Sequence, residues 1–213
     1  MKTTLKLSML ALASIIVLDS CKKGENDPFL SFKSRKGRVE GEWKLSSSEA
    51  TTVDAGTTST DKFDGANMSS IVGSGTPTVT TYEETMTMGK DGSYKMTSKQ
   101  VYTKTVGTIV TTVTWDETAS GTWNFTSKVG EAKNKDHITI TTNTWSTNET
   151  TIITGMPVLT DPESGSYTGD LAPTAVYYLD ELRGKKMVIT KVGTATQNGP
   201  DSYTEIKTFE QSK

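Results

Sequence analysis

Residues 82–96, YEETMTMGKDGSYKM, decide the fold class of this 213-residue chain. Over residues 82–88 the side chains alternate, with Tyr82, Met86 and Met88 on one side and Glu83, Thr85 and Thr87 on the other. This period of two is typical of a half-buried β-strand. The turn-forming segment Gly89-Lys90-Asp91-Gly92 follows, and Tyr94 and Met96 then resume the alternation. The stretch therefore predicts a β-hairpin.

The same alternation recurs along most of the chain after Gly37. The segments that carry it are Ile109–Trp115, Gly121–Phe125, Ile138–Ile140, Val176–Leu182, Lys186–Val192 and Ser202–Phe209. Threonine, which suits half-exposed strands because it is β-branched, is abundant, whereas leucine and alanine are scarce. About ten candidate strands follow one another, so we predict an all-β fold, an antiparallel up-and-down meander closing into a barrel of about 8–10 strands. A β-sandwich is the alternative.

The connections between these strands fall into two classes. Short turns are predicted at Gly107, Glu117–Ser120, Arg183–Lys185 and Gln197–Pro200. Two long stretches, Ser46–Pro77 and Gly155–Pro173, are rich in polar residues, glycine or proline, and we expect both to be loops. Loops of this length are lids, binding loops or disordered segments, and for Ser46–Pro77 the sequence leaves order and disorder open.

The start of the chain has the layout of a secretory signal peptide. Lys2 and Lys6 give it a positive charge, Leu7 to Leu18 is apolar apart from two serines, and Cys21 follows. The apolar run is shorter than the roughly 20 residues that a membrane-spanning helix needs. We therefore divide the chain into a cleaved leader (1–20), a polar tether (21–37) and a β-barrel domain (38–213).

Cys21 is the only cysteine in the sequence, so the mature domain has no internal disulfide. The segment Leu18-Asp19-Ser20-Cys21 resembles the lipobox of bacterial lipoproteins, which implies that Cys21 carries two or three acyl chains such as palmitate. Lys22 favours sorting to the outer membrane, and the side of that membrane stays open. A plain cleaved signal peptide, leaving a free thiol, is the alternative.

The charged residues limit the classes of partner that we expect for the chain. Removing residues 1–20 takes two lysines and one aspartate from the 23 basic and 25 acidic residues, which leaves a formal net charge of −3. The chain therefore has no basic bias to attract nucleic acid. A short basic cluster, Lys33, Arg35, Lys36 and Arg38, is expected to be a solvated segment of the chain.

Two Gly-x-Trp triplets connect the chain with a known family. Gly41-Glu42-Trp43 opens the domain, and Gly121-Thr122-Trp123 repeats the pattern. The order of tether, Gly-x-Trp strand, long stretch and meander resembles the lipocalin-like domains of small bacterial envelope lipoproteins, over roughly residues 38–210. The late pattern of Tyr178, Leu182, Met187 and Ile189 is similar to that group as well. The resemblance implies a lipocalin-like barrel in which Gly41, Trp43, Gly121 and Trp123 are structural.

No catalytic or metal-binding motif accompanies these features. His137 is the only histidine, and no Gly-x-Ser-x-Gly motif is present to supply a nucleophile. The carboxylate pairs Glu83-Glu84 and Asp180-Glu181 are expected to be solvated charges rather than a glycosidase pair. We therefore expect no enzyme activity, no cofactor and no metal site.

The hypothesis that follows is a monomeric, non-enzymatic envelope lipoprotein, attached to the membrane by its lipid and holding a small apolar ligand in the barrel mouth beneath Ser46–Pro77. The candidate lining residues are Tyr82, Met86, Met88, Tyr94, Met96 and Trp115, although a filled barrel core would use the same side chains. The alternative is a structural module that presents loops to an envelope protein or a polysaccharide.

Overall fold

A computed structural model describes residues 34–126, 137–194 and 201–212. Within these ranges the chain is almost entirely antiparallel β-structure. The elements are α2 (Arg35–Val39), β1 (Gly41–Asp54), β2 (Thr57–Phe63), β3 (Asn67–Val72), β4 (Thr78–Met88), β5 (Ser93–Val106), β6 (Ile109–Phe125), β7 (His137–Ile153), β8 (Leu159–Ser166), the short 3-10 helix η2 (Gly169–Leu171), β9 (Thr174–Arg183), β10 (Lys186–Thr194) and β11 (Ser202–Gln211).

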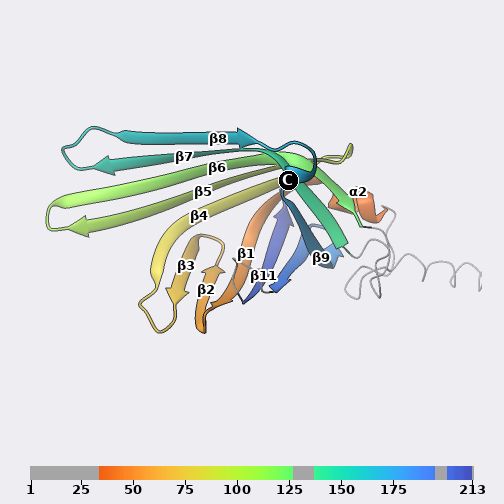
Figure 1. Cartoon of the computed structure of the whole chain (residues 1–213), viewed down its shortest axis with the longest axis horizontal. Helices are drawn as coiled ribbons and strands as arrows, with labels where there is room; N and C mark the ends of the chain where they lie inside the picture. Colours follow the sequence, from red (N-terminus) through yellow and green to blue (C-terminus); the bar gives the residue numbers. More distant parts are fainter. Residues whose placement is uncertain (1–33, 127–136, 195–200, 213) are drawn as a thin grey trace, which may run out of the picture.

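The strands form one closed barrel. Their order is β6-β5-β4-β3-β2-β1-β11-β10-β9-β7-β8, and a further pairing of β6 with β7 closes the ring (Figure 1). Ten strands make the ring, and β8 is an additional strand hydrogen-bonded to β7. This architecture confirms the predicted all-β antiparallel barrel and excludes the sandwich.

The barrel is narrower at one end than at the other. At its start β1 pairs directly with β4, Trp43 lying opposite Met86, whereas from Ser48 onward β1 pairs with β2. The β2–β3 hairpin is therefore bypassed at the narrow end and inserted between β1 and β4 at the wide end. The large buried side chains gather at the narrow end, among them Trp43, Met88, Ile138, Leu182, Met187 and Phe209.

Helix α2 lies at the narrow end, against β9 (Figure 1). Arg35 and Arg38 are buried and donate to the carbonyl oxygens of Leu179 and Leu182, at 3.1 and 2.7 Å. Our expectation of a solvated basic cluster is therefore wrong for these two arginines, because their guanidinium groups satisfy strand carbonyls. Helix α2 also includes residues 35–37, which we assigned to the tether, so folded structure begins before residue 38.

Two expected loops contain strands instead. Ser46–Pro77 holds the second half of β1 together with β2 and β3, and Gly155–Pro173 holds β8 and η2. Both loop predictions are therefore wrong, because sheet pairing uses backbone groups and polar Ser and Thr side chains suit strands with solvated faces. The expected turn at Glu117–Ser120 is wrong too, since β6 runs continuously through it. Turns at Gly89–Gly92, Gly107 and Gly184 are confirmed, and Gln197–Pro200 lies outside the described residues.

Four strands extend beyond the ring and form what we call the arm, residues 102–115 of β5 and β6 and residues 145–166 of β7 and β8. Strand β4 pairs with β5 only as far as Val101, and β9 pairs with β7 only over residues 137–141. Beyond these points β5, β6, β7 and β8 continue as a sheet that projects away from the barrel (Figure 1).

Candidate functional site

The barrel interior contains a buried charge cluster that two strands build. On β4, Glu84 lies two residues before the buried Met86, and on β11, Lys207 lies two residues before the buried Phe209. Because side chains of a strand alternate between its faces, both charged groups point into the barrel with those apolar neighbours. Tyr82 and Glu205, one further step along each strand, share the same inward face.

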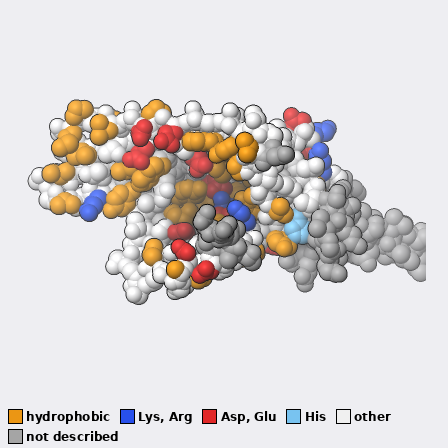
Figure 2. Space-filling model, viewed as in Figure 1, with side chains coloured by type: hydrophobic (Ala, Val, Ile, Leu, Met, Phe, Trp, Pro, Cys, Tyr) orange, Lys and Arg blue, Asp and Glu red, His pale blue; other side chains and the backbone are white. Residues whose placement is uncertain are grey.

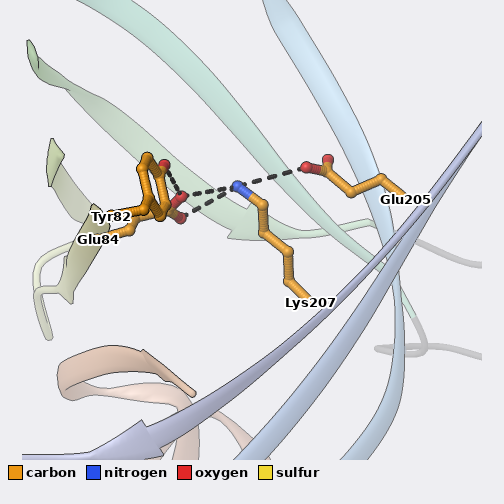
Figure 3. Close-up of polar contacts among 4 residues, drawn as sticks. All are labelled: Tyr82, Glu84, Glu205 and Lys207. Carbon is orange, nitrogen blue, oxygen red and sulfur yellow. Dashed lines mark hydrogen bonds and ion pairs between the residues drawn. The ribbon is translucent and has the colours of Figure 1, made fainter. Parts of the chain in front are cut away.

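The four side chains contact one another (Figure 3). The Lys207 ammonium donates to both carboxylate oxygens of Glu84, with Nζ at 3.1 Å from Oε1 and 2.9 Å from Oε2. The Tyr82 hydroxyl donates to Oε2 of Glu84 at 2.8 Å. Glu205 Oε1 lies 3.5 Å from Lys207 Nζ. Glu84 is only 3% exposed, so this network replaces the water that its carboxylate would otherwise bind.

Burial and charge fix the protonation states in the cluster. Burial by itself would lower the pKa of Lys207, but the Glu84 and Glu205 carboxylates outweigh it and raise that pKa above its ordinary value. Burial, assisted by the Glu84 charge, raises the pKa of the Tyr82 phenol. Lys207 is therefore a cation and Tyr82 a neutral donor at physiological pH.

A cavity of about 560 Å³ opens where the barrel interior meets the base of the arm. Its walls combine aromatic and apolar side chains, including Tyr94, Met96, Trp145 and Tyr177, with the ammonium of Lys191 and the carboxylate of Glu117. Lys191 Nζ lies 6.0 Å from the ring centroid of Tyr177. Burial raises the pKa of Tyr94 and of Tyr177, so both phenols stay neutral and can donate hydrogen bonds.

A second cavity, of about 340 Å³, contains the charge cluster itself. Tyr82, Glu84, Glu205 and Lys207 line it together with Tyr203. Lys191 Nζ lies 5.5 Å from the ring centroid of Tyr203, as well as near Tyr177 of the first cavity, so Lys191 stands between the two spaces. In Figure 2 apolar, acidic and basic side chains meet around a hollow at the centre of the molecule.

The structure separates the six residues that we expected to line one ligand site. Tyr94 and Met96 line the first cavity, and Tyr82 lines the second. Met86 and Met88 belong to the packed core, at 3% and 1% exposure. Trp115 lies on the arm, where it borders a shallow hollow with Tyr102. The fold therefore does not bring these six residues together in a single site beneath Ser46–Pro77.

The two Gly-x-Trp triplets lie where strands and turns approach closely. Trp43 is fully buried, and its indole nitrogen donates to Val39 O of α2 at 2.7 Å. The Trp123 indole donates to Gly89 O at 2.9 Å and so holds the β4–β5 turn. A Cβ at Gly121 would overlap the carbonyl oxygen of Thr141, and one at Gly41 would meet the Gln211 side chain. Cys21 lies outside the described residues.

The other residues considered for chemistry are scattered. His137 is the first residue of β7, and its ring centroid is 4.2 Å from that of Tyr178. Glu83 is exposed on the outer face of β4 while Glu84 is buried, so our expectation that both are solvated is wrong for Glu84. Among the described residues, no group of three or more His, Cys, Asp or Glu side chains is placed to hold a metal ion.

Sequence reasoning missed most of the interior polar residues, namely Glu84, Trp145, Tyr177, Lys191, Tyr203, Glu205 and Lys207. A signal for two of them was present, since Glu84 and Lys207 keep the period of two set by Met86 and Phe209. The residue types oppose this signal, because charged residues are rarely buried unless they are paired.

No protein-family model matches the chain, and no curated protein matches its sequence. None of the helices in the described ranges is long and apolar enough to cross a membrane. The functional argument therefore starts from the cavities and their side chains.

Proposed function

We propose that this protein is a non-enzymatic binding protein of the bacterial cell envelope that takes up a small amphipathic molecule in the cavity beside Lys191. The observation that carries the proposal is the cavity of about 560 Å³ itself. Its volume lies in the range of roughly 300–1,000 Å³ that is usual for small-molecule sites.

The chemistry of the walls narrows the ligand class. Tyr94, Trp145 and Tyr177 offer flat apolar surfaces to a ring or an acyl chain. Lys191 offers a cation, and a buried polar ligand group needs such a partner. Glu117 offers a carboxylate that accepts hydrogen bonds. The ligand that fits is therefore an apolar body with one acidic group for Lys191 and one hydrogen-bond donor for Glu117, which is more polar than the apolar ligand that the sequence suggested.

The leader supports the cellular setting of this proposal. The lipobox-like segment ending at Cys21 supports lipid attachment, and Lys22 favours the outer membrane. One acyl chain holds a protein weakly, whereas two or more hold it firmly. The chain from Cys21 to Ser34 can span roughly 45 Å when extended, so the barrel would stand clear of the membrane surface.

Two dyes that differ in charge test the ligand site. Anilinonaphthalene sulfonate, which is anionic, is expected to bind the purified protein more tightly than uncharged N-phenylnaphthylamine. The Lys191→Met variant should weaken only the anionic dye, by about tenfold, because one buried ion pair is lost. Binding of each dye is measured by fluorescence titration.

A matched pair of variants locates the bound dye. Ala119 is buried and lines the cavity, so Ala119→Phe should fill the space and abolish binding of both dyes. Thr118→Phe puts the same ring on the opposite face of β6 and should leave binding unchanged. Near-UV circular dichroism shows that each variant is folded. Dye binding that survives Ala119→Phe would refute the site, and an intact mass without lipid at Cys21 would refute the anchor.

A further inference from the structure

The far end of the arm is formed by two hairpins that lie side by side. We call it the arm tip and define it as residues 105–114, around the β5–β6 turn, and residues 150–160, around the β7–β8 turn. The Thr154 amide donates to Val110 O at 3.0 Å, and the Val110 amide donates to the Thr154 hydroxyl at 3.1 Å. These bonds fix the two hairpin ends as one surface.

The arm tip exposes large apolar side chains, and one lysine, Lys104, lies beside it. Its exposed apolar residues are Val106, Ile109, Val110, Ile152, Met156, Val158 and Leu159, each between 38% and 63% exposed. None of residues 105–114 or 150–160 is Asp, Glu, Lys or Arg, and the exposed Lys104 lies opposite Thr111 on the edge strand β5. Figure 2 shows apolar side chains gathered at the left end of the molecule, with a basic side chain beside them. Concentrated exposed apolar surface of this kind marks an interaction site.

The apolar side chains lie on both faces of the arm tip. Ile109 and Val110 are adjacent in β6 and therefore point to opposite faces. In β7, Ile152 lies opposite Thr112 and shares the face of Val110. Met156 and Val158 are exposed in the connecting turn between β7 and β8. A protein that docks on a sheet covers one face, whereas a surface that is apolar all round suits a medium that surrounds it.

The polarity of the arm changes in order along its length. Next to the apolar tip stand Tyr102 and Trp115, and the Trp115 indole donates to Glu149 Oε2 at 2.8 Å. Further from the tip, or level with Glu149, are the carboxylates of Asp116, Asp161 and Glu163. Lys104, level with Thr111, lies between the tip and these rings, and its long stem lets the ammonium reach the headgroups. An apolar end followed by lysine and amphipathic aromatic rings, with carboxylates from the level of Trp115 onward, is a pattern that suits the surface of a lipid bilayer.

We propose that the arm tip inserts into the interface of a zwitterionic lipid bilayer. The insertion is shallow, because within the described residues the edge of β5 beyond Val101 and the outer edge of β8 carry no strand partner. Unpaired backbone groups are not tolerated in the hydrocarbon, so the tip reaches roughly 5–10 Å, to the boundary of headgroups and acyl chains.

The carboxylates behind the tip select the lipid charge. Asp116, Glu149, Asp161 and Glu163 outnumber Lys99 and Lys104 on this part of the arm, so an anionic surface within a Debye length repels it and a neutral or zwitterionic surface is preferred. A second copy of the chain is disfavoured as the occupant, because both open edges are protected against strand addition. The β8 edge carries Pro162 between Asp161 and Glu163, and the β5 edge carries the exposed Lys104.

Insertion at the arm tip is independent of the cavity and of any lipid on Cys21. The tip and α2 lie at opposite ends of the molecule (Figure 1). The arm would therefore give the protein a second membrane contact, remote from its N-terminus.

Local fluorescent labels test the inference. In the full chain carrying Cys21→Ser, single cysteines are introduced by Val158→Cys at the tip or Lys185→Cys in the β9–β10 turn and labelled with nitrobenzoxadiazole. With phosphatidylcholine vesicles the tip label should shift to the blue, and a quencher on the upper acyl chain should quench it. The label at residue 185 should not change, and because the readout is local, contact by another part of the chain does not mimic insertion.

Two valines of equal exposure provide the matched variants. Val106 at the tip and Val72 in β3 are both 63% exposed. In the chain labelled at residue 158, Val106→Asp should raise about tenfold the lipid concentration that gives half of the vesicle-dependent shift, since it brings a charge into the interface. Val72→Asp should leave the shift unchanged, and both variants should retain dye binding in the cavity.

Three results would overturn the inference. The first is a tip label that does not respond to vesicles, and the second is an equal loss with Val72→Asp and Val106→Asp. The third is a blue shift that rises with protein concentration in the absence of vesicles, which would assign the tip to contact between copies of the chain. Loss of dye binding with an intact vesicle response would count against the proposed ligand site alone.

Discussion

Glu84 and Lys207 illustrate what a buried ion pair contributes. Both groups give up water on folding, and this desolvation offsets most of their mutual attraction. The pair therefore adds little net stability, but each member is needed once the other is buried. The Tyr82 hydroxyl and the Glu205 carboxylate complete the network.

Removing one member of this pair is expected to be costly. Lys207→Met should lower the free energy of unfolding by about 3–5 kcal/mol, because it leaves two carboxylates without their cation. Glu84→Gln should cost less, since Glu205 remains 3.5 Å from the ammonium. The double variant should cost less than the sum of the two single variants, as measured by urea unfolding.

An exposed pair in the same barrel serves as the control. Lys62 and Glu49 contact at 3.3 Å on the surface of β1 and β2, where both side chains are more than half exposed. Lys62→Met should change the free energy of unfolding by no more than about 1 kcal/mol. Equal costs for Lys62→Met and Lys207→Met would show that burial does not matter to the cluster.

The buried phenols and the ammonium make stability depend on alkaline pH. Burial is the first cause of the raised pKa of Tyr82, Tyr94, Tyr177 and Tyr203, while carboxylates raise that of Lys207. Each group holds its proton longer in the folded state than in the unfolded chain. Their stabilisation is therefore complete below the unfolded pKa values, near 10, and is lost as the pH rises above them.

We expect the free energy of unfolding to fall above about pH 10 by up to about 1.4 kcal/mol per pH unit for a well-buried group such as Tyr94. Urea unfolding at a series of pH values measures the fall, and phenolate absorbance reports ionisation. Tyr94→Phe removes one ionisable group, so the slope of the free energy of unfolding against pH should decrease by the contribution of one proton. A free energy of unfolding that stays constant from pH 9 to pH 11.5 would contradict this account.

At the scale of elements, periodicity predicted strands better than it predicted their ends. Residues 82–96 gave the β4–β5 hairpin because apolar alternation and turn chemistry agree there. In residues 46–77 the strands have few apolar side chains, so the polar composition pointed to a loop while the backbone groups were free to pair. Glu117–Ser120 has the composition of a turn and lies within β6, where neighbours on both sides hold it extended.

The contacts between elements required the structure. Glu84 and Lys207 are 123 positions apart, and they meet only because β1 lies between β4 and β11 at the narrow end. Gly121 was recognised as part of a motif, but the reason for glycine is the carbonyl of Thr141 on the neighbouring strand. Register between distant strands depends on the packing of the whole barrel, which no local pattern contains.

At the scale of the molecule, the barrel and the arm differ in how they are held together. The narrow end encloses Trp43, Met88, Met187 and Phe209, all at most 1% exposed. The arm presents both faces to its surroundings, and its strands are joined mainly by backbone hydrogen bonds and by threonine pairs such as Thr103 with Thr112. Regions with little buried apolar surface open at lower free energies than the core does.

Hydrogen exchange should therefore divide the backbone amides into two groups. Amides of residues 103–113 and 150–158 are expected to exchange through local opening of the arm, at a lower free energy than amides around residues 43, 138 and 187. Exchange of the barrel amides should follow global unfolding and accelerate strongly in low concentrations of urea. Mass spectrometry of peptides from the native protein measures both groups.

A core variant tests whether the arm opens while the barrel stays folded. Ile138 is fully buried, and Ile138→Val should cost about 0.5–1.5 kcal/mol of global stability. The free energy of exchange of the barrel amides should fall by that amount. The free energy of exchange of the arm amides should not change, because residue 138 stays packed in the core when only the arm opens. If the arm amides fell by the same amount, arm and barrel would unfold as one unit. The arm would then be as rigidly built as the barrel, and its exposed tip would be held in place for contact by the same core that encloses the cavity.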